Sequence, residues 1–342
     1  MEKIDLRDLD LGEMEELLRA LGAPSYRARQ LFAWVHGRGK SDWEEMTDLP
    51  RALREELAAR SYVSKLEPCR HAVAADGRTQ KYLVSLPDGQ AVETVRMDYR
   101  RRTNRSRRTA CLSSQVGCSL GCRFCATGEV GFRRNLRPGE LVGQVYFWNE
   151  RAGAAGTGRI TNVVYMGMGE PLLNYEAVRK SIVLLSHPLG QNIGHRRITV
   201  STCGVVPGIE RLAAEGPPVR LAVSLHAADD ALRSRLVPIN RRYPLDILLG
   251  ACRAYTARTG RRVTFAYLLL AGLNDQPQEA HRLARRLAGI PCGGCGSSAA
   301  YNPCAPFTPA GTSCFPLTVI VAFAVLFPGA QSATSTGSAF TV

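Results

Sequence analysis

A chain of 342 residues exceeds the usual size of a single domain, so it can bury a large core and carry an appended module. Its net charge of +14 predicts a polyanionic partner, with nucleic acid the first candidate. No apolar run is long enough to span a bilayer and the first residues lack a secretory signal, which predicts a cytoplasmic protein without membrane contact. In that compartment the eleven cysteines are metal, redox or core residues rather than disulfides.

Residues 1–80 are predicted to form a small helical domain. "DLGEMEELLRALG" begins after Asp10, a candidate N-cap, and "SYRARQLFAWVHGRG" repeats apolar residues at helical spacing. Residues 81–110 are a predicted connector, in which "KYLVSLPDGQAVETVRM" places two β-rich runs around an Asp-Gly turn and indicates a hairpin. The connector ends in "RRRTNRSRR", residues 100–108, which either grips RNA phosphates or forms a solvated basic loop.

Residues 111–291 alternate β-rich runs with helical runs, from "ACLSSQV" to "QPQEAHRLARRLAG". Five such repeats predict a parallel sheet with right-handed crossovers. Because the repeats stop short of eight, the expected α/β fold is an incomplete parallel (βα) barrel preceded by the helical domain. Chemistry in such folds gathers at the carboxyl ends of the strands, so residues directly after β-rich runs are site candidates.

Residues 292–342 contain no Asp, Glu, Lys, Arg or His, although the chain before them is rich in charge. A folded α/β domain rarely loses every charge over such a length. We therefore expect an aberrant, frame-shifted terminus, with a genuine surface-binding tail as the alternative.

Three cysteines, Cys118, Cys122 and Cys125, lie within "CSLGCRFCATGE". Structural zinc usually takes four protein ligands, and ferredoxin-type clusters use four thiolates in a denser run. Three thiolates on a four-iron cluster would leave one iron open to a substrate or cofactor.

This triplet, with Phe124 before its last cysteine, resembles the signature loop of radical S-adenosylmethionine (SAM) enzymes. With "ITNVVYMGMGEPLLNY", "RRITVSTCGVVPGI" and "LAVSLHA", it resembles the RlmN and Cfr family of RNA adenine methyltransferases. The resemblance implies a [4Fe-4S] cluster on the three cysteines, SAM on its open iron, and a 5'-deoxyadenosyl radical that initiates methylation of adenine C2. The implied substrates are ribosomal RNA and, as a second candidate, transfer RNA. Adenine C2 is an electron-poor carbon between two ring nitrogens, so its methylation requires radical chemistry.

The resemblance also implies that the helical domain of residues 1–80 is an accessory RNA-binding domain, and it assigns further site residues. SAM contacts fall on Gly169, Glu170, Ser201, Ser224, Leu225 and His226. Glu93, in "VETV", matches the family's proton acceptor, and Cys111 matches the thiol that resolves the covalent RNA adduct by forming a disulfide with a methyl-carrying cysteine. Without the resemblance, each of these has a plain structural reading, such as a turn carboxylate, a satisfied histidine or a small buried strand residue. Three other cysteines, Cys69, Cys203 and Cys252, are expected to be structural.

No methyl-carrying cysteine is identifiable among Cys292, Cys295, Cys304 and Cys314. The chain as written is therefore expected to cleave SAM without forming 2-methyladenosine. Two alternatives stay open beside RNA methylation: another radical SAM reaction, and an RNA-binding relative that cannot methylate. The resemblance further implies a monomer that receives electrons from a low-potential donor such as flavodoxin or ferredoxin.

Overall fold

The computed structural model describes residues 3–99, 106–291 and 319–322, which fall into two compact units. The first unit comprises Met1–Val116, Arg133–Val200 and Gly216–Val219, and the second comprises Gly117–Phe132, Ser201–Glu215 and Arg220–Val342. Most of the arginine-rich run and nearly all of the charge-free terminus lie outside the described residues.

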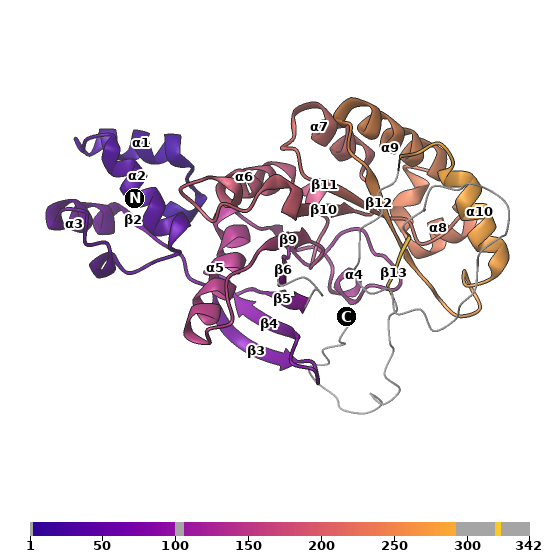
Figure 1. The fold of residues 1–342 in the computed structure, drawn as a ribbon, viewed down its shortest axis with the longest axis horizontal. Coiled ribbons are helices and arrows are strands. Elements are labelled where there is room, and N and C mark those ends of the chain that lie inside the picture. Colours follow the sequence, from indigo (N-terminus) through magenta and orange to yellow (C-terminus); the bar gives the residue numbers. More distant parts are fainter. Residues whose placement is uncertain (1–2, 100–105, 292–318, 323–342) are drawn as a thin grey trace. The chain divides into compact units, whose positions relative to one another are not determined.

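The first unit begins with the predicted helices, α1 (Leu11–Ala20), α2 (Tyr26–Phe32) and α3 (Arg51–Arg60) (Figure 1). Asp10 caps α1 as expected: its carboxylate accepts a hydrogen bond from the Glu13 amide at 3.0 Å, and the Glu13 carboxylate accepts one from the Asp10 amide at 2.7 Å. Short strands β1 (Ile4–Asp5) and β2 (Ser61–Tyr62) pair in parallel and close this part of the chain.

The sheet of the first unit has the strand order β10-β9-β6-β5-β4-β3. Its strands are β3 (Glu67–Val73), β4 (Thr79–Ser85), β5 (Ala91–Tyr99), β6 (Arg107–Cys111), β9 (Asn162–Tyr165) and β10 (Ile198–Thr202). β4 and β5 form the predicted hairpin, whereas β3 is a strand that was not predicted. The sheet changes from antiparallel to parallel pairing at β6, which pairs antiparallel with β5 and parallel with β9.

Two helices supply the crossovers of this unit. α5 (Pro138–Ala154) and α6 (Tyr175–Ser186) pack against each other along the sheet's parallel part (Figure 1). A small antiparallel pair, β7 (Gln115–Val116) and β8 (Arg134–Asn135), precedes α5.

The second unit repeats the strand-helix alternation. Its strands β11 (Arg220–Ser224), β12 (Val263–Leu268) and β13 (Val319–Ala322) are all parallel. Its helices are α4 (Ala126–Val130), α7 (Val206–Glu215), α8 (Asp230–Leu236), α9 (Leu245–Thr259) and α10 (Pro277–Leu287). Leu221, Ala222 and Val223 are consecutive and buried, as expected of a parallel strand covered on both faces. The parallel α/β core is therefore confirmed, and β13 adds a strand that was not predicted.

Within the described ranges, no helix combines the length and apolar character needed to cross a bilayer.

Candidate active site

The cysteine triplet lies on one closed loop of the second unit, Gly117–Phe132, which we call the triplet loop. The loop is pinched at its base, because a Cβ atom on Gly117 would overlap the carbonyl oxygen of Gly131. Gly117 also has φ +74°, which favours glycine. The triplet is thus carried on a loop whose two ends are in contact.

Cys122 anchors the triplet loop to the helix that follows β11. It is buried in one apolar cluster with Leu236 and Val237, at the end of α8. The Arg123 amide donates a hydrogen bond to the Leu236 carbonyl at 3.0 Å, and the Cys125 amide donates one to the Cys122 carbonyl at 3.1 Å. Cys118 and Cys125 are only partly buried, so two of the three thiols stay accessible.

The donor set of the triplet fits a four-iron cluster. All three cysteines are free thiols, which are the soft donors that iron-sulfur clusters take. Among the described residues, no three His, Cys, Asp or Glu side chains converge on a single metal ion. Because a four-iron cluster offers each thiolate a separate iron, it suits sulfurs spread along a loop better than a single ion does.

Phe124 joins the triplet loop to the residues after β11. Its ring meets the His226 ring edge-on, with centroids 4.8 Å apart and planes at 78°. His226 has φ +61°, its Nδ1 accepts a hydrogen bond from the Leu268 amide at 3.0 Å, and its carbonyl accepts one from Asn274 Nδ2 at 2.8 Å. Burial, together with the charge of Arg233, lowers the pKa of His226 to about 4, so the imidazole is neutral at neutral pH.

The other candidates of the second unit are also at carboxyl ends of strands. Ser201 lies at the end of β10 and Ser224 at the end of β11, and both are partly buried. Leu225 is buried, and its amide donates a hydrogen bond to the Ala266 carbonyl at 2.9 Å. The second unit therefore brings the triplet together with the predicted SAM contacts Ser224, Leu225 and His226.

The first unit holds Gly169 and Glu170 on the loop after β9. Gly169 has φ +94°, and a Cβ atom there would lie 2.5 Å from Cβ of Gln115. Glu170 is 2% exposed; its amide donates to Gln115 Oε1 at 2.8 Å and its carboxylate accepts from the Leu172 amide at 3.1 Å. Gly169 therefore lies tightly against Gln115, in the strand that leads into the triplet loop, and its role as a SAM contact stays a prediction.

Glu93 and Cys111 lie on neighbouring strands of the first unit. The Glu93 carboxylate forms an ion pair with Lys81 Nζ at 2.8 Å, and the Ser113 hydroxyl donates to the Glu93 carbonyl at 2.5 Å. Cys111 ends β6 opposite Val95. Burial, and to a smaller extent the nearby Glu93 charge, raises the pKa of the Cys111 thiol to about 12, so it is protonated at neutral pH. The role of Glu93 as proton acceptor stays a prediction.

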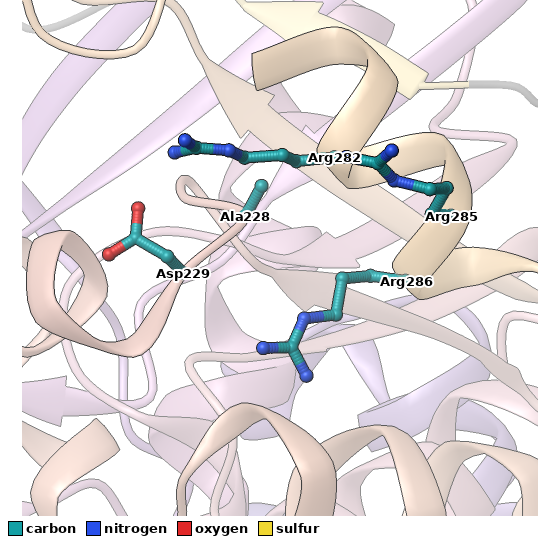
Figure 2. Close-up of a pocket in the computed structure, with 5 residues that line it drawn as sticks. All are labelled: Ala228, Asp229, Arg282, Arg285 and Arg286. Atoms are coloured by element: carbon teal, nitrogen blue, oxygen red, sulfur yellow. The ribbon is translucent and has the colours of Figure 1, made fainter. Parts of the chain in front are cut away.

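A basic hollow of about 370 Å³ lies in the second unit, two residues beyond His226. Figure 2 shows the five residues that line it: Ala228, Asp229, Arg282, Arg285 and Arg286. Arg282 pairs with Glu279 at 2.8 Å and Arg286 pairs with Asp246. Within the part of the chain that the structure describes, Arg285 has no ion-pair partner and its charge is available to a bound anion.

Two residues near the triplet could not be identified from the sequence. Cys203 Sγ lies 3.9 Å from Cys122 Sγ, although 81 residues separate them. Arg233 is fully buried beside both. The position of Cys203 just after β10 was the only available signal for it.

The comparisons with known proteins agree with this arrangement. The sequence model of the radical SAM superfamily matches residues 112–284, and that of the ribosomal RNA large subunit methyltransferase N-terminal domain matches residues 4–63. A probable dual-specificity RNA methyltransferase RlmN from Moorella thermoacetica is 54% identical over 83% of this chain and 80% of its own length. The chain belongs to the RlmN family of radical SAM proteins. The RlmN of Anaeromyxobacter dehalogenans is 48% identical over 84% of this chain and 76% of its own.

A solved structure supports the RlmN fold as well. The crystal structure of a radical SAM methyltransferase from Sphaerobacter thermophilus is 51% identical, covers 84% of this chain and 83% of its own, and superposes with a TM-score of 0.79. The predicted family and fold class are confirmed. The radical SAM family uses a [4Fe-4S] cluster and SAM as cofactors, in agreement with the donor set on the triplet loop.

Proposed function

We propose that this chain is a radical SAM methyltransferase that methylates C2 of adenine in ribosomal RNA and also in transfer RNA. The observation that carries the proposal is the contact of Phe124 with His226, because it joins the thiol triplet to the predicted SAM-binding residues after β11. The relatives named as dual-specificity RNA methyltransferases support the substrate class.

The residues of the second unit would hold both cofactors. Cys118, Cys122 and Cys125 would bind the cluster, and the Ser201, Ser224, Leu225 and His226 positions would contact SAM. When bound, the cluster and SAM supply the radical chemistry that an electron-poor carbon requires. SAM carries a positive sulfonium, and the neutral imidazole of His226 would add no further positive charge to a site that binds it.

Residues of the first unit would accept the proton and resolve the covalent RNA adduct. The Glu93 carboxylate, paired with Lys81 Nζ at 2.8 Å, would accept a proton from the RNA adduct. The Cys111 thiol is protonated at neutral pH and would react only when it resolves the RNA adduct by forming a disulfide. Gly169 and Glu170 would add SAM contacts from this unit.

The partners follow from surface charge and family. The basic hollow at Arg282, Arg285 and Arg286 offers a phosphate contact for RNA. A monomeric state, a cytoplasmic location and a flavodoxin or ferredoxin as electron donor belong to this proposal. The seven cysteines that the structure describes are all free thiols, in keeping with a reducing compartment.

The decisive experiment is mass spectrometry of digested RNA after incubation of the reconstituted protein with isotopically labelled SAM and a reductant. Labelled 2-methyladenosine confirms the proposal, and Cys118→Ala and Glu93→Gln should each abolish it.

A second candidate function follows from the charge-free terminus, in which no methyl-carrying cysteine is identifiable. This candidate is a relative that cleaves SAM but does not transfer the methyl group. Formation of 5'-deoxyadenosine without labelled 2-methyladenosine would favour it and overturn the methylation proposal. Labelled 2-methyladenosine would instead show that a cysteine of this chain serves as carrier.

A further inference from the structure

Arg233, on α8, is a buried cation. Its exposed fraction is 0%, which is rare for arginine unless a partner of opposite charge is present. The residue has no role in the proposed function described above. Its surroundings therefore need an explanation of their own.

The partners of the Arg233 guanidinium are neutral. Its nitrogen atoms donate hydrogen bonds to the Leu225 carbonyl (3.0 Å), Asn240 Oδ1 (2.8 Å), the Cys203 carbonyl (2.7 Å) and the Ser224 carbonyl (3.1 Å). In the described part of the chain no carboxylate forms an ion pair with it. The Asp230 charge acts on Arg233 from a distance, and its carboxylate is joined to it through Asn240, whose Nδ2 donates to Asp230 Oδ1 at 2.9 Å.

A buried charge with only neutral partners is costly, because four carbonyl-type dipoles replace solvation without cancelling the charge. Burial lowers the pKa of Arg233, and the nearby sulfurs of Cys203 and Cys122 act in the opposite direction. A guanidinium nevertheless stays protonated in proteins. No carboxylate touches the guanidinium in the described part of the chain, so its positive charge acts on the groups nearest to it, which include these sulfurs.

The triplet loop lies directly against α8. Cys122 shares a buried cluster with Leu236 and Val237, one turn beyond Arg233, and Cys203 packs against the same cluster. Arg233 binds the Cys203 carbonyl, and the Cys203 sulfur lies 3.9 Å from that of Cys122. A cluster on Cys122 would thus form within the field of this cation, on the buried side of the triplet loop.

We propose that Arg233 is the fixed positive charge that stabilises the reduced, more negative form of the cluster and so raises its reduction potential. Three thiolates outweigh the charge of the iron-sulfur core, and reduction adds one more negative charge. Net charge and exposure are among the properties that set cluster potentials, and the Coulomb interaction of a buried cation such as Arg233 is screened less than that of an exposed one. The inference rests on cluster binding by the triplet, but it does not depend on which RNA is methylated.

The test is a redox titration of the reconstituted full-length protein, followed by electron paramagnetic resonance without SAM or RNA. Arg233→Gln should reduce the ratio of reduced to oxidised cluster at a fixed potential by about tenfold, which is 59 mV for a one-electron couple. Arg233→Lys keeps the charge and should stay close to the parent. Arg235→Gln removes an exposed arginine from the same helix and is the matched control.

A charge swap tests the field without creating a cavity. Asp230→Asn combined with Asn240→Asp keeps net charge and volume, but it moves the carboxylate from the far side of Asn240 onto the guanidinium. The swapped protein should show the same direction of shift as Arg233→Gln.

The outcomes separate charge from packing. If Arg233→Gln and the swap both leave the potential at the parent value, the proposal is overturned. If neither Arg233→Gln nor the swapped protein binds iron, the iron content of Arg233→Lys decides. Iron content equal to that of the parent supports the charge role. Loss of iron from Arg233→Lys as well overturns it. Failure of methylation alone would contradict the proposed function and leave these potentials as an independent result.

Discussion

Cys122 Sγ and Cys203 Sγ lie 3.9 Å apart, yet only Cys122 belongs to the triplet. We expect Cys122→Ala, like Cys118→Ala or Cys125→Ala, to abolish binding of about four irons per chain, because a cluster with two thiolate ligands is poorly held. Cys203→Ala should keep its iron, since Cys203 lies outside the triplet and is predicted to be structural. The measurement is the iron-to-protein ratio after anaerobic reconstitution. Loss of iron from Cys203→Ala would make Cys203 a ligand.

The raised pKa of Cys111 predicts slow alkylation at neutral pH. The thiol should react with iodoacetamide far more slowly than the exposed Cys69 in the same chain, because only the thiolate is nucleophilic. Glu93→Gln removes a negative charge that raises this pKa and leaves the Lys81 cation in place. Alkylation at Cys111 should therefore accelerate by about tenfold for each unit by which the pKa falls. Peptide mass spectrometry follows both cysteines, and an unchanged rate would disprove the coupling.

Gly169 and Gly260 form a matched pair for substitution by alanine. Both have positive φ, +94° and +64°, but only Gly169 has a close neighbour, at Gln115. Gly260→Ala should cost about 1–2 kcal/mol of unfolding free energy from backbone strain. Gly169→Ala should cost about 2–5 kcal/mol, because overlap with Gln115 is added. Urea unfolding measures both, and equal losses would show that Gln115 moves aside freely.

The basic hollow predicts a measurable salt effect. Arg285→Gln should reduce the slope of the logarithm of RNA affinity against the logarithm of salt concentration by about one unit, if Arg285 touches one phosphate. Arg211→Gln changes an arginine that is already paired with Glu215, at 2.7 Å, and should leave the slope unchanged. Filter binding over a range of salt concentrations compares the two. Equal slopes for parent and Arg285→Gln would mean that RNA does not contact the hollow.

His36 should make the protein acid-sensitive. Burial lowers its pKa to about 3, and its Nδ1 lies 2.7 Å from the Tyr146 hydroxyl. Between the unfolded pKa near 6.5 and the folded value, the unfolded chain binds the proton and the folded chain does not. Stability therefore falls as pH drops, by about 1.4 kcal/mol per pH unit from this group.

His36→Asn should remove this part of the pH dependence, although it also lowers stability at pH 7. His281→Gln, at an exposed position, is the control. Urea midpoints at pH 7.5 and 5 give the slopes for parent and variants. A parent slope retained by His36→Asn would assign the acid sensitivity to other groups.

Local chemistry made much of the fold predictable. The capping box at Asp10 and the Asp-Gly hairpin turn are encoded within a few residues, and the structure has both. β3 escaped prediction because Glu67–Val73 is almost wholly exposed and lacks the alternation that marks a half-buried strand. The parallel strand-helix repeats from β6 onward could be predicted because apolar runs and amphipathic helical runs alternate in the sequence.

The candidate site was predictable only where it is contiguous in sequence. The triplet and the residues after β11 were found from motifs, and their roles as ligands stay predictions. Arg233 and Cys203 became visible only when tertiary folding brought them to Cys122, because no local pattern separates a buried arginine from an exposed one such as Arg235. Long-range contacts of this kind depend on how the two segments pack.

The pinched base of the triplet loop confines the consequences of oxidative damage. Gly117 and Gly131 meet at the two ends of the loop, and the segments that flank it in the sequence pair as β7 and β8. If oxygen removes the iron, the residues that lose a constraint are those between the two glycines. Because the ends of this loop stay in contact, the rest of the chain need not pay a new loop-closure entropy. We therefore expect the loss of order to stay within residues 117–131, while β7 and β8 keep their pairing. Repair then requires a fresh supply of iron and sulfide, without refolding of the polypeptide.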